Sequence, residues 1–530
     1  MGVRSWSARR ALIVLVVAGA LLAPACSSDE GSEEPGSSPT TGASEAVNQD
    51  GFLRIGYDLI QNGQWSWNPG IGNSGTSMDP MWYLVYGRLM RKAADGTLIP
   101  DQAESAEVVD ANTIEVKLRP DQTWSDGAPF DAAAVKAGLD SNIAAKNQGN
   151  LGADYSGVGG TVTVDVVDPT TVKINVPNQA APQWLEYLAD VGGTIIRPGT
   201  EQNPATAPIG AGPFKVTEYN AGSLLTLERN ESFWNADEVN FAKIGTVSTN
   251  QSQPQVATAA LQAGQADIVT FDTTQLSTLS GDLKEVVVSD PNRLVRMAFC
   301  KRDAPLSNVD VRKAISLAID REAINEAVYA GTATPATQFW PEGDRFYNPE
   351  VGDSMGYDLE GAKQALADSG IANPSFDLYL LGSFNMPDVG TVVQEQLRQI
   401  GIETNLIITR DFVGEFLQPQ KPGATFFPPT PTPGSRRLQT VTGNNLGNLC
   451  SYQNAELEKL AADLTKVSSQ SQEAQDIWWQ IDQIVADEAL AAPIVFGAVI
   501  GGYDESTLVL DGTYNGGTWV IPDIYNSYMQ

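Results

Sequence analysis

The alternation of hydrophobic and polar residues predicts a mixture of strands and helices along most of this chain. Strands are expected where apolar and polar positions alternate or where valine is frequent, at residues 52–57, 113–118, 162–167 and 171–176. The last two runs flank Pro169 and predict a hairpin. An apolar helix is expected around residues 81–89, and a second helix follows residue 130, with Val135 and Leu139 one turn apart on the same face.

The later part of the chain alternates strand and helix more plainly. A strand, a helix and a second strand are predicted in this order, at residues 376–381, 388–400 and 402–408. Such an order predicts a right-handed parallel crossover, and therefore an α/β fold. Two further helices with stripes of leucine and isoleucine are expected at residues 455–467 and 473–486. We interpret these stripes as core packing.

The beginning of the chain has the pattern of an export signal. Basic residues precede an apolar run at residues 11–23, which is too short for a stable membrane span. Small residues and then Cys26 follow, the arrangement that a lipoprotein signal peptidase needs around a thiol that is acylated. We therefore predict a lipoprotein signal peptide at residues 1–26 with Cys26 as the lipid anchor, and ordinary secretion is the alternative. Arg9 and Arg10 also fit a twin-arginine signal, so the export route stays open.

Composition separates a tether from a folded body. Residues 27–50 are mostly Ser, Gly, Glu, Thr and Pro with almost nothing to bury, so we expect a disordered tether. The folded part starts near Gly51, and the remaining chain, about 480 residues, is long enough to bury a large core divided into two or three domains. No later apolar run reaches the length of a membrane span. We therefore expect contact with the membrane through the lipid anchor only.

Charge and the absence of histidine exclude several kinds of function. The chain has 33 basic and 64 acidic residues, a net charge of −31, and such a surface repels nucleic acid. It has no histidine, so a Ser-His-Asp triad and histidine-bound metals cannot be built. No phosphate-loop motif occurs, and we expect no cofactor, no metal and no catalysis. The G-x-G-x-x-G run at residues 70–75 follows a loop and not a strand, so we interpret it as a glycine-rich turn.

Two cysteines follow Cys26 in the sequence, namely Cys300 and Cys450. They form an even pair in a compartment where disulfides persist, and we predict that they are bonded to each other. The alternative is two buried thiols that lie too far apart to be joined.

Three further segments have a distinctive order of residues. They read LRPDQTWSDGAPFDA at residues 118–132, GAGPFK at 210–215 with LERN at 227–230, and APLSNVDVRKAI at 304–315 with AIDREAI at 318–324. In this order they resemble the signatures of the family 5 extracellular solute-binding proteins, the oligopeptide- and dipeptide-binding class of ABC importers. Asp126 and Gly127 also supply a turn, and Asp320 suits the cap of a helix, so we interpret these residues as structural and not as ligand contacts.

The resemblance implies an α/β, two-lobed fold similar to the periplasmic binding proteins of type II, cluster C, with an extra subdomain inserted in lobe one. The implied lobe one comprises residues 51–295 and 495–530, with the insertion at 80–185, and lobe two comprises 296–494. A monomer of this kind encloses a small-molecule or peptide ligand and delivers it to ABC permease subunits at the outer face of the cytoplasmic membrane. The implied function is binding and not catalysis.

The resemblance does not extend to the residue that receives a peptide amine. The family places an acidic residue after the second crossover strand, whereas residues 425–437 contain several prolines and no acid. Arg410, Arg436 and Arg437 are therefore candidates for contact with an anionic group, and solvated arginines of an outer loop are the alternative. The other ligand-binding candidates are aromatic or polar, namely Trp65, Trp67, Asn73, Ser383, Phe384, Asn385, Phe426, Phe427, Asn444 and Asn445.

Three functions are open at this point. An import receptor for a peptide or a peptide-like solute is favoured. The second is a lipoprotein of the same fold that has lost transport and acts as a regulatory or scaffolding factor in envelope assembly. The third is a hydrolase that uses paired carboxylates.

Overall fold

The structure is a computed structural model of the chain. It describes residues 49–57, 67, 79–93, 97–145, 161–200, 208–220, 222–249, 253–428, 437–443, 447–513 and 519–530. The predicted signal peptide, Cys26 and almost all of the predicted tether lie outside these residues. Residues 47–530 form one compact unit. Among the described residues, no helix combines the length and the apolar character that a membrane crossing requires.

Within the described residues, the largest sheet has eleven strands. Ten of them follow one another from edge to edge as β15 (Glu403–Thr409), β14 (Ser375–Leu381), β16 (Ala424–Phe427), β12 (Leu283–Phe299), β17 (Ala491–Asp504), β11 (Ile268–Phe271), β1 (Gly51–Tyr57), β10 (Phe241–Ser248), β9 (Leu224–Arg229) and β8 (Phe214–Asn220). The short strand β13 (Thr334–Pro335) pairs with β17. The predicted strand at residues 52–57 is confirmed as β1.

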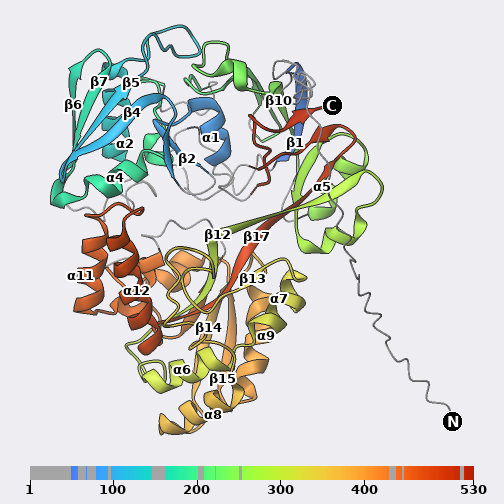
Figure 1. The fold of residues 1–530 in the computed structure, drawn as a ribbon. Coiled ribbons are helices and arrows are strands. Elements are labelled where there is room, and N and C mark those ends of the chain that lie inside the picture. Colours follow the sequence, from blue (N-terminus) through green and yellow to red (C-terminus); the bar gives the residue numbers. More distant parts are fainter. Residues whose placement is uncertain are drawn as a thin grey trace, which may run out of the picture. The chain divides into compact units, whose positions relative to one another are not determined.

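The long strands β12 and β17 lie side by side and run antiparallel through the middle of this sheet (Figure 1). Their first stretch of pairing joins residues 283–289 to 498–504, where β17 also pairs with β11. Their second stretch joins residues 294–298 to 491–496, where β12 also pairs with β16. The register is irregular between Ser289 and Leu294. A second register shift lies between Val295 and Arg296. The two strands therefore connect two sets of partner strands across the longer of these irregularities, the interruption between Ser289 and Leu294.

A separate four-stranded sheet confirms the strands predicted in the first part of the chain. Its order is β4 (Ala103–Asp110), β5 (Thr113–Leu118), β7 (Thr171–Asn175) and β6 (Thr163–Asp168). The strands β6 and β7 pair antiparallel on either side of Pro169, as predicted. The helices α2 (Ala132–Ala145) and α4 (Ala181–Tyr187) pack against this sheet. Both Val135 and Leu139 of α2 are buried in the core.

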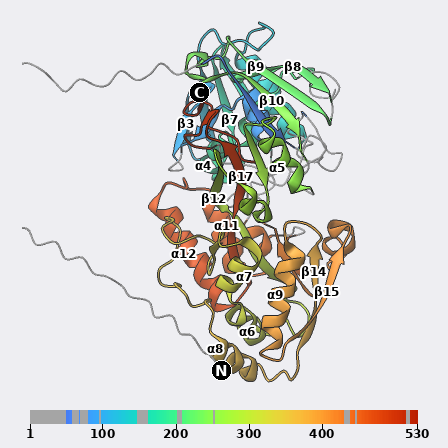
Figure 2. The same cartoon turned by 90° about the vertical axis from the view of Figure 1, so that its right-hand side faces the viewer.

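The predicted strand, helix and strand in the later part of the chain are also present. They are β14, α9 (Met386–Arg398) and β15, and the two strands pair in parallel. Figure 2 shows α9 beside both strands, with which it is in contact. Gly401 has a φ of 87°, a left-handed conformation that glycine adopts readily where a helix ends. The leucine and isoleucine stripes belong to α11 (Ala455–Leu464) and α12 (Gln472–Asp487), and most of these side chains are buried or packed against the core.

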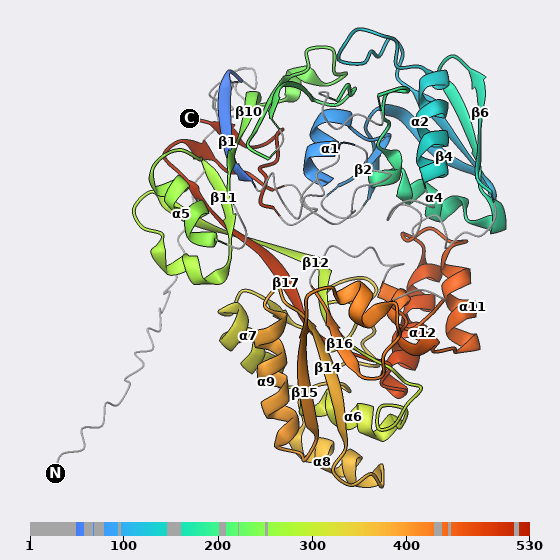
Figure 3. The ribbon, with the colours of Figure 1, turned by 180° about the vertical axis from the view of Figure 1, so that it is seen from behind.

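The remaining elements are short or lie next to the sheets. The helices are α1 (Asp79–Tyr86), α5 (Pro254–Gln262), α6 (Val309–Ala318), α7 (Arg321–Tyr329) and α8 (Leu359–Asp368). Two small antiparallel pairs are β2 (Met90–Lys92) with β3 (Leu98–Pro100), and β18 (Leu508–Val509) with β19 (Tyr528–Met529). The end of the chain lies next to β1 (Figure 3).

The hydrophobic core consists of separate clusters on either side of the interruption in β12. The largest cluster is built from residues between 53 and 288 and from residues 499 onward. Two further clusters, which we call the α9 cluster and the α12 cluster after the helices in them, are built from residues 294–496. The burial pattern therefore changes at the same positions where β12 and β17 change partners.

The motifs that carry the family resemblance have structural roles in the described residues. Asp320 caps α7 by accepting a hydrogen bond from the backbone of Ala323 at 2.9 Å. A β-carbon at Gly210 would lie 1.9 Å from the carbonyl oxygen of Val85, so this position requires glycine. The guanidinium of Arg119 stacks on the ring of Trp234 at 3.7 Å. Their interpretation as structural residues agrees with these contacts.

Candidate ligand-binding site

The described residues include eight of the thirteen predicted ligand contacts. Trp65, Asn73, Arg436, Asn444 and Asn445 lie outside the described part of the chain. Trp67, Ser383, Phe384, Asn385, Arg410, Phe426, Phe427 and Arg437 lie within it. These residues differ strongly in burial.

Two of the predicted aromatic contacts are core residues in this structure. Phe426 is completely buried and packs in the α9 cluster. Trp67 is 4% exposed, belongs to the largest core cluster, and lies edge-on to Tyr219 with ring centres 5.8 Å apart. Neither ring has a free face on which an apolar or sugar surface could stack. Their prediction as stacking residues is therefore corrected, because the pattern of aromatic residues did not distinguish core packing from an exposed ring.

Other predicted contacts gather at one edge of the large sheet. The strand β14 pairs in parallel with both β15 and β16, so the carboxyl ends of these three strands meet at the same edge (Figure 3). The turn with Ser383, Phe384 and Asn385 follows β14, Arg410 follows β15, and Phe427 ends β16. In open α/β sheets, ligands bind at the carboxyl ends of the strands. We call this group of strand ends the carboxyl edge.

The turn after β14 has an unusual backbone. Phe384 and Asn385 have φ values of 58° and 60°, which are uncommon for residues with a β-carbon. Phe384 packs against the α9 cluster, whereas Ser383 is exposed. Arg410 is also exposed. The turn therefore offers polar groups at the carboxyl edge, next to the half-buried ring of Phe384.

Arg437 is buried, so its interpretation as a solvated arginine of an outer loop is wrong. Its guanidinium stacks on the ring of Trp340 at 3.8 Å and donates to the carbonyl oxygen of Phe339. It also donates to the amide oxygen of Asn292 at 3.2 Å. Because Asn292 lies in the irregular stretch of β12, Arg437 ties this stretch to the neighbouring α12 cluster.

A second arginine that sequence reasoning missed lies beside Arg437. Arg296 of β12 stands opposite Phe427 in the ladder with β16, and its guanidinium lies 5.2 Å from the centre of the Phe427 ring. It is 4% exposed. Burial, together with a smaller effect of the positive charge of Arg437, lowers the pKa of Arg296 to about 9. A positive charge in an apolar strand, between Val295 and Met297, was the signal in the sequence that could have identified it.

Arg437 has acidic neighbours that partly balance its charge. Burial lowers the pKa of Arg437 to about 10, while Asp344, Asp290 and Asp482 oppose this shift. Asp482 of α12 is itself buried, which raises its pKa well above the usual range. A cavity of about 10 Å³ lies beside it, which is about the space that one water molecule needs. A water there would supply a partner for the buried oxygen Oδ2 of Asp482.

A second buried polar network lies near the end of β12. Lys301 donates to the carbonyl oxygens of Phe299 and Leu490 at 3.2 and 3.3 Å, and it faces the ring of Tyr452 at 4.8 Å. The hydroxyl of Tyr452 donates to Glu488 at 2.5 Å. Burial, with a smaller effect of the neighbouring Arg312, lowers the pKa of Lys301 to about 7, and Glu488 opposes this shift.

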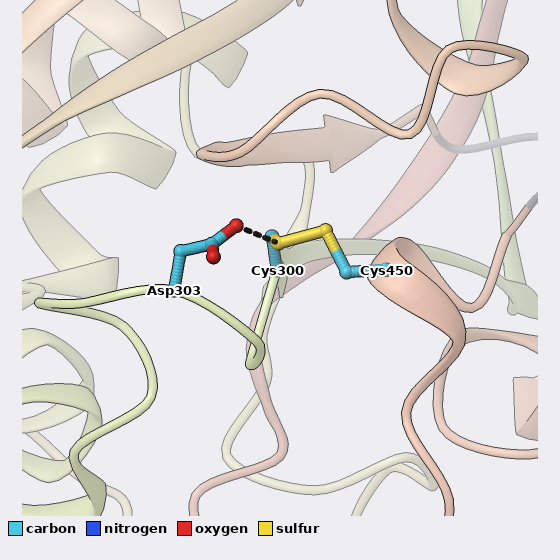
Figure 4. A group of neighbouring side chains, drawn as sticks. All are labelled: Cys300, Asp303 and Cys450. Carbon is cyan, nitrogen blue, oxygen red and sulfur yellow. Dashed lines mark hydrogen bonds between the residues drawn. A yellow bond between two sulfur atoms is a disulfide. The ribbon is translucent and has the colours of Figure 1, made fainter.

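Cys300 and Cys450 are joined as a disulfide in the structure, with their α-carbons 5.2 Å apart (Figure 4). The carboxylate of Asp303 lies 3.8 Å from the sulfur of Cys300. In the described residues these three side chains form a group with metal-ligand spacing. Because metals bind thiolates and these sulfurs are bonded to each other, the group holds no metal in this form.

The fold is similar to that of solved substrate-binding proteins. The crystal structure of the ABC transporter substrate binding protein CtaP from Listeria monocytogenes is similar with a TM-score of 0.78, at 23% identity over 91% of this chain and 99% of that chain. The oligopeptide-binding protein AppA from Bacillus subtilis, in complex with a nonapeptide, is similar with a TM-score of 0.70, at 21% identity over 91% of this chain and 100% of that chain. The expected α/β fold of cluster C is thereby confirmed.

Residues 97–426 match the model of the bacterial extracellular solute-binding proteins, family 5. The chain belongs to this family. The glutathione-binding protein GsiB of Salmonella paratyphi A is 28% identical over 310 residues, which cover 56% of this chain and 58% of that protein. The chain thus spans less than two thirds of the length of the curated relatives it matches. The family is one of binding proteins and not of enzymes.

The Cys300–Cys450 disulfide predicts a measurable contribution to stability. It closes a loop with a sequence separation of 150 residues, and removing a disulfide typically lowers the free energy of unfolding by about 2–5 kcal/mol. We expect this loss in the C300S/C450S double variant, measured by urea unfolding. Wild-type protein treated with a reductant should lose a similar amount, whereas the double variant should not respond to the reductant. An unchanged unfolding midpoint in both samples would contradict the prediction.

The buried Lys301 predicts a pH dependence. In the unfolded chain Lys301 is protonated up to its ordinary pKa of 10.5, but in the folded protein only up to about 7. The folded state therefore binds fewer protons between these values, so this residue makes the stability rise with pH from about 7 to 10. The free energy of unfolding of the wild type, minus that of the Lys301→Met variant, should be lowest below pH 7 and should increase as the pH rises to about 10.

Urea unfolding at several pH values from 6 to 10 measures this difference. Lys363→Met is the matched control, because Lys363 is exposed on α8 and pairs with Glu360 at 2.7 Å. Its difference from the wild type should stay nearly constant with pH. A constant difference for Lys301→Met as well would show that Lys301 does not titrate in this range.

Proposed function

We propose that this protein is the extracytoplasmic substrate-binding component of an ABC importer and captures a peptide or a peptide-like solute. The match of residues 97–426 to the family 5 solute-binding proteins is the observation that carries the proposal. The curated relatives bind glutathione, a tripeptide-like solute, and this supports the same class of ligand here. Delivery of the solute to permease subunits, and action as a monomer, belong to the same proposal.

The proposed capture takes place between two lobes. Lobe one comprises residues 51–295 and 495–530, with an inserted subdomain at 80–185, and lobe two comprises 296–494. The division is supported by the core clusters, which separate at the same positions of β12 and β17. The interrupted pairing between Ser289 and Leu294 is the natural place for the lobes to move, because fewer ladder bonds resist a change there.

Closure follows from the contacts that a bound solute makes. A solute that contacts both lobes stabilises the closed form, and only such a difference in contacts can shift the equilibrium towards closure. The carboxyl edge supplies one set of contacts from lobe two, with Ser383, Asn385 and Arg410 as polar groups. The permease then distinguishes the closed form from the open one.

The proposal includes attachment to the outer face of the cytoplasmic membrane through Cys26. The apolar run at residues 11–23 and the small residues before Cys26 support it. Residues 27–50 would then span from the lipid to the folded body as a tether. In this arrangement a captured solute stays near the permease.

Thermal unfolding with candidate solutes tests the capture. We expect glutathione or members of a tripeptide library to raise the melting temperature, because a ligand at 100 times its Kd stabilises the folded state by about 2.7 kcal/mol. The same amino acids, free and at the same concentrations, are the control and should have little effect. If no solute raises the melting temperature and native mass spectrometry finds no co-purifying solute, a regulatory or scaffolding role without transport is favoured instead.

Expression of the full-length chain tests the anchor. We expect the wild-type protein to partition into the detergent phase of Triton X-114 and to incorporate a labelled fatty acid. Cys26→Ala should abolish both. The C300S/C450S variant should retain both, because it lacks two cysteines but keeps Cys26, the thiol that is predicted to be acylated. Equal partitioning of the Cys26→Ala variant and the wild type would contradict the anchor and leave solute capture unaffected.

A further inference from the structure

Two buried arginines near Arg296 are bonded to several backbone acceptors. Arg312 donates to the carbonyl oxygens of Leu306, Ser307, Glu488 and Ala489 at 2.6–3.1 Å. Such a guanidinium has exchanged its water for backbone acceptors and acts as a structural cross-link between α6 and the end of α12. Arg321 follows the same pattern, with the carbonyl oxygens of Ser316, Ile319 and Pro493 as acceptors.

Arg296 is different. Its hydrogen bond in the structure is a long one of 3.4 Å to the carbonyl oxygen of Leu294, on the same strand. Its Nε atom is buried and has no hydrogen-bond partner among the described residues. Apart from burial, the charge that acts on Arg296 is the like charge of Arg437. A buried guanidinium with so few acceptors is costly for folding, which raises the question of what this residue binds.

The position of Arg296 indicates the answer. Side chains alternate across a strand, and Val295 and Met297 face the α9 cluster, so Arg296 faces the side of Phe427 and Arg437. It lies at the carboxyl edge, opposite the last residue of β16. It also follows directly after the irregular stretch of β12 that Arg437 holds through Asn292.

We infer that Arg296, together with Arg437, is the receptor for a carboxylate of the bound solute, placed where the two long strands change partners. A guanidinium offers a planar pair of donors that matches a carboxylate. In Arg296 the Nε donor has no partner among the described residues, and the hydrogen bond from Nη1 is long. The anion also relieves the repulsion between the two arginines. The inference rests on the proposed function and deepens it, because it assigns the solute a negatively charged group.

The same contact links binding to closure. An anion between the guanidiniums draws Arg296 and Arg437 together, and Arg437 already holds Asn292 of the interrupted ladder. Reaching Arg296 requires the surrounding residues to part, since its side chain is buried. Entry of the carboxylate and movement at the interruption are therefore coupled. Such coupling allows the bound solute to stabilise the closed form.

The Arg296→Met variant separates this function from a purely structural role. Replacing a buried, poorly paired charge with an apolar side chain of similar length is often neutral or stabilising. We therefore expect Arg296→Met to have a melting temperature without solute equal to or above that of the wild type, and yet to lose solute recognition. A residue needed only for packing would behave in the opposite way, with lower stability and unchanged binding.

The probe is a random tripeptide library prepared once with free carboxyl ends and once with amide ends. For the wild type, the free-acid library should act at concentrations at least about 30-fold lower than the amide library, as expected for a buried charge pair. Arg296→Met should remove this preference, and Arg296→Lys should retain part of it. Acetate, compared with chloride at equal ionic strength, should stabilise the wild type and not Arg296→Met.

Two matched variants complete the design. Arg398→Met removes an exposed positive charge that pairs with Glu395 on α9, and it should change neither stability nor preference appreciably. Arg312→Met removes a buried cation with backbone acceptors, so it should lower the melting temperature and leave the acid preference unchanged.

The outcomes distinguish the inference from the proposed function. If both libraries bind equally well, or if Arg296→Met keeps the acid preference, the carboxylate receptor is wrong and peptide capture stands. If neither library binds, peptide capture fails, and the acetate measurement decides the inference: stabilisation that depends on Arg296 supports an anion site, and its absence overturns the site. Stabilisation by inorganic phosphate but not by acetate would also overturn the assignment to a carboxylate.

Discussion

The antiparallel ladder between β12 and β17 is the constraint on which the rest of the structure depends. One stretch of this ladder supports β11 and the strands beyond it, and the other supports β16, β14 and β15. Each stretch has its own hydrophobic core, so burial stabilises the two halves separately. The interruption between Ser289 and Leu294 leaves the connection with fewer ladder bonds than either half. The lobe movement proposed above would take place at this interruption and leave each core intact.

Side-chain hydrogen bonds hold the backbone at the interruption, where ladder hydrogen bonds are missing. Asp290 accepts a hydrogen bond from the backbone of Asn292 at 2.8 Å, and Asn292 accepts one from Arg437. Arg437 in turn stacks on Trp340, whose ring packs against Trp478 and Phe346 in the α12 cluster. Polar contacts of this kind depend on geometry more strongly than apolar contacts do. The interruption therefore has a defined arrangement that a change in the position of Arg437 would alter.

The sequence predicts most of the regular elements but only part of the candidate site. The strand at residues 113–118 and the parallel pair of β14 and β15 follow from local periodicity and turn residues, which act over a few positions. Phe426, Trp67 and Arg437 were misjudged or left open because burial depends on which distant segments pack together. Arg296 and Asp482 were missed for the same reason, since a charged residue in a sequence gives no sign of its final neighbours. The carboxyl edge becomes visible only when β16 joins β14, where the bonded residues Tyr379 and Thr425 are 46 positions apart along the chain.

Because the chain has a large negative net charge, attraction for an anion has to come from contacts at short range. At −31, the molecule as a whole repels a negatively charged solute over distances up to about the Debye length, roughly 8 Å at physiological ionic strength. An exposed arginine such as Arg410 competes with water and with this field, so it contributes little selectivity. A buried guanidinium acts in a medium of lower polarity, where each contact is stronger. Burial of Arg296 therefore lowers the stability of the empty protein and, by the same physical cause, strengthens the attraction for a carboxylate that reaches it.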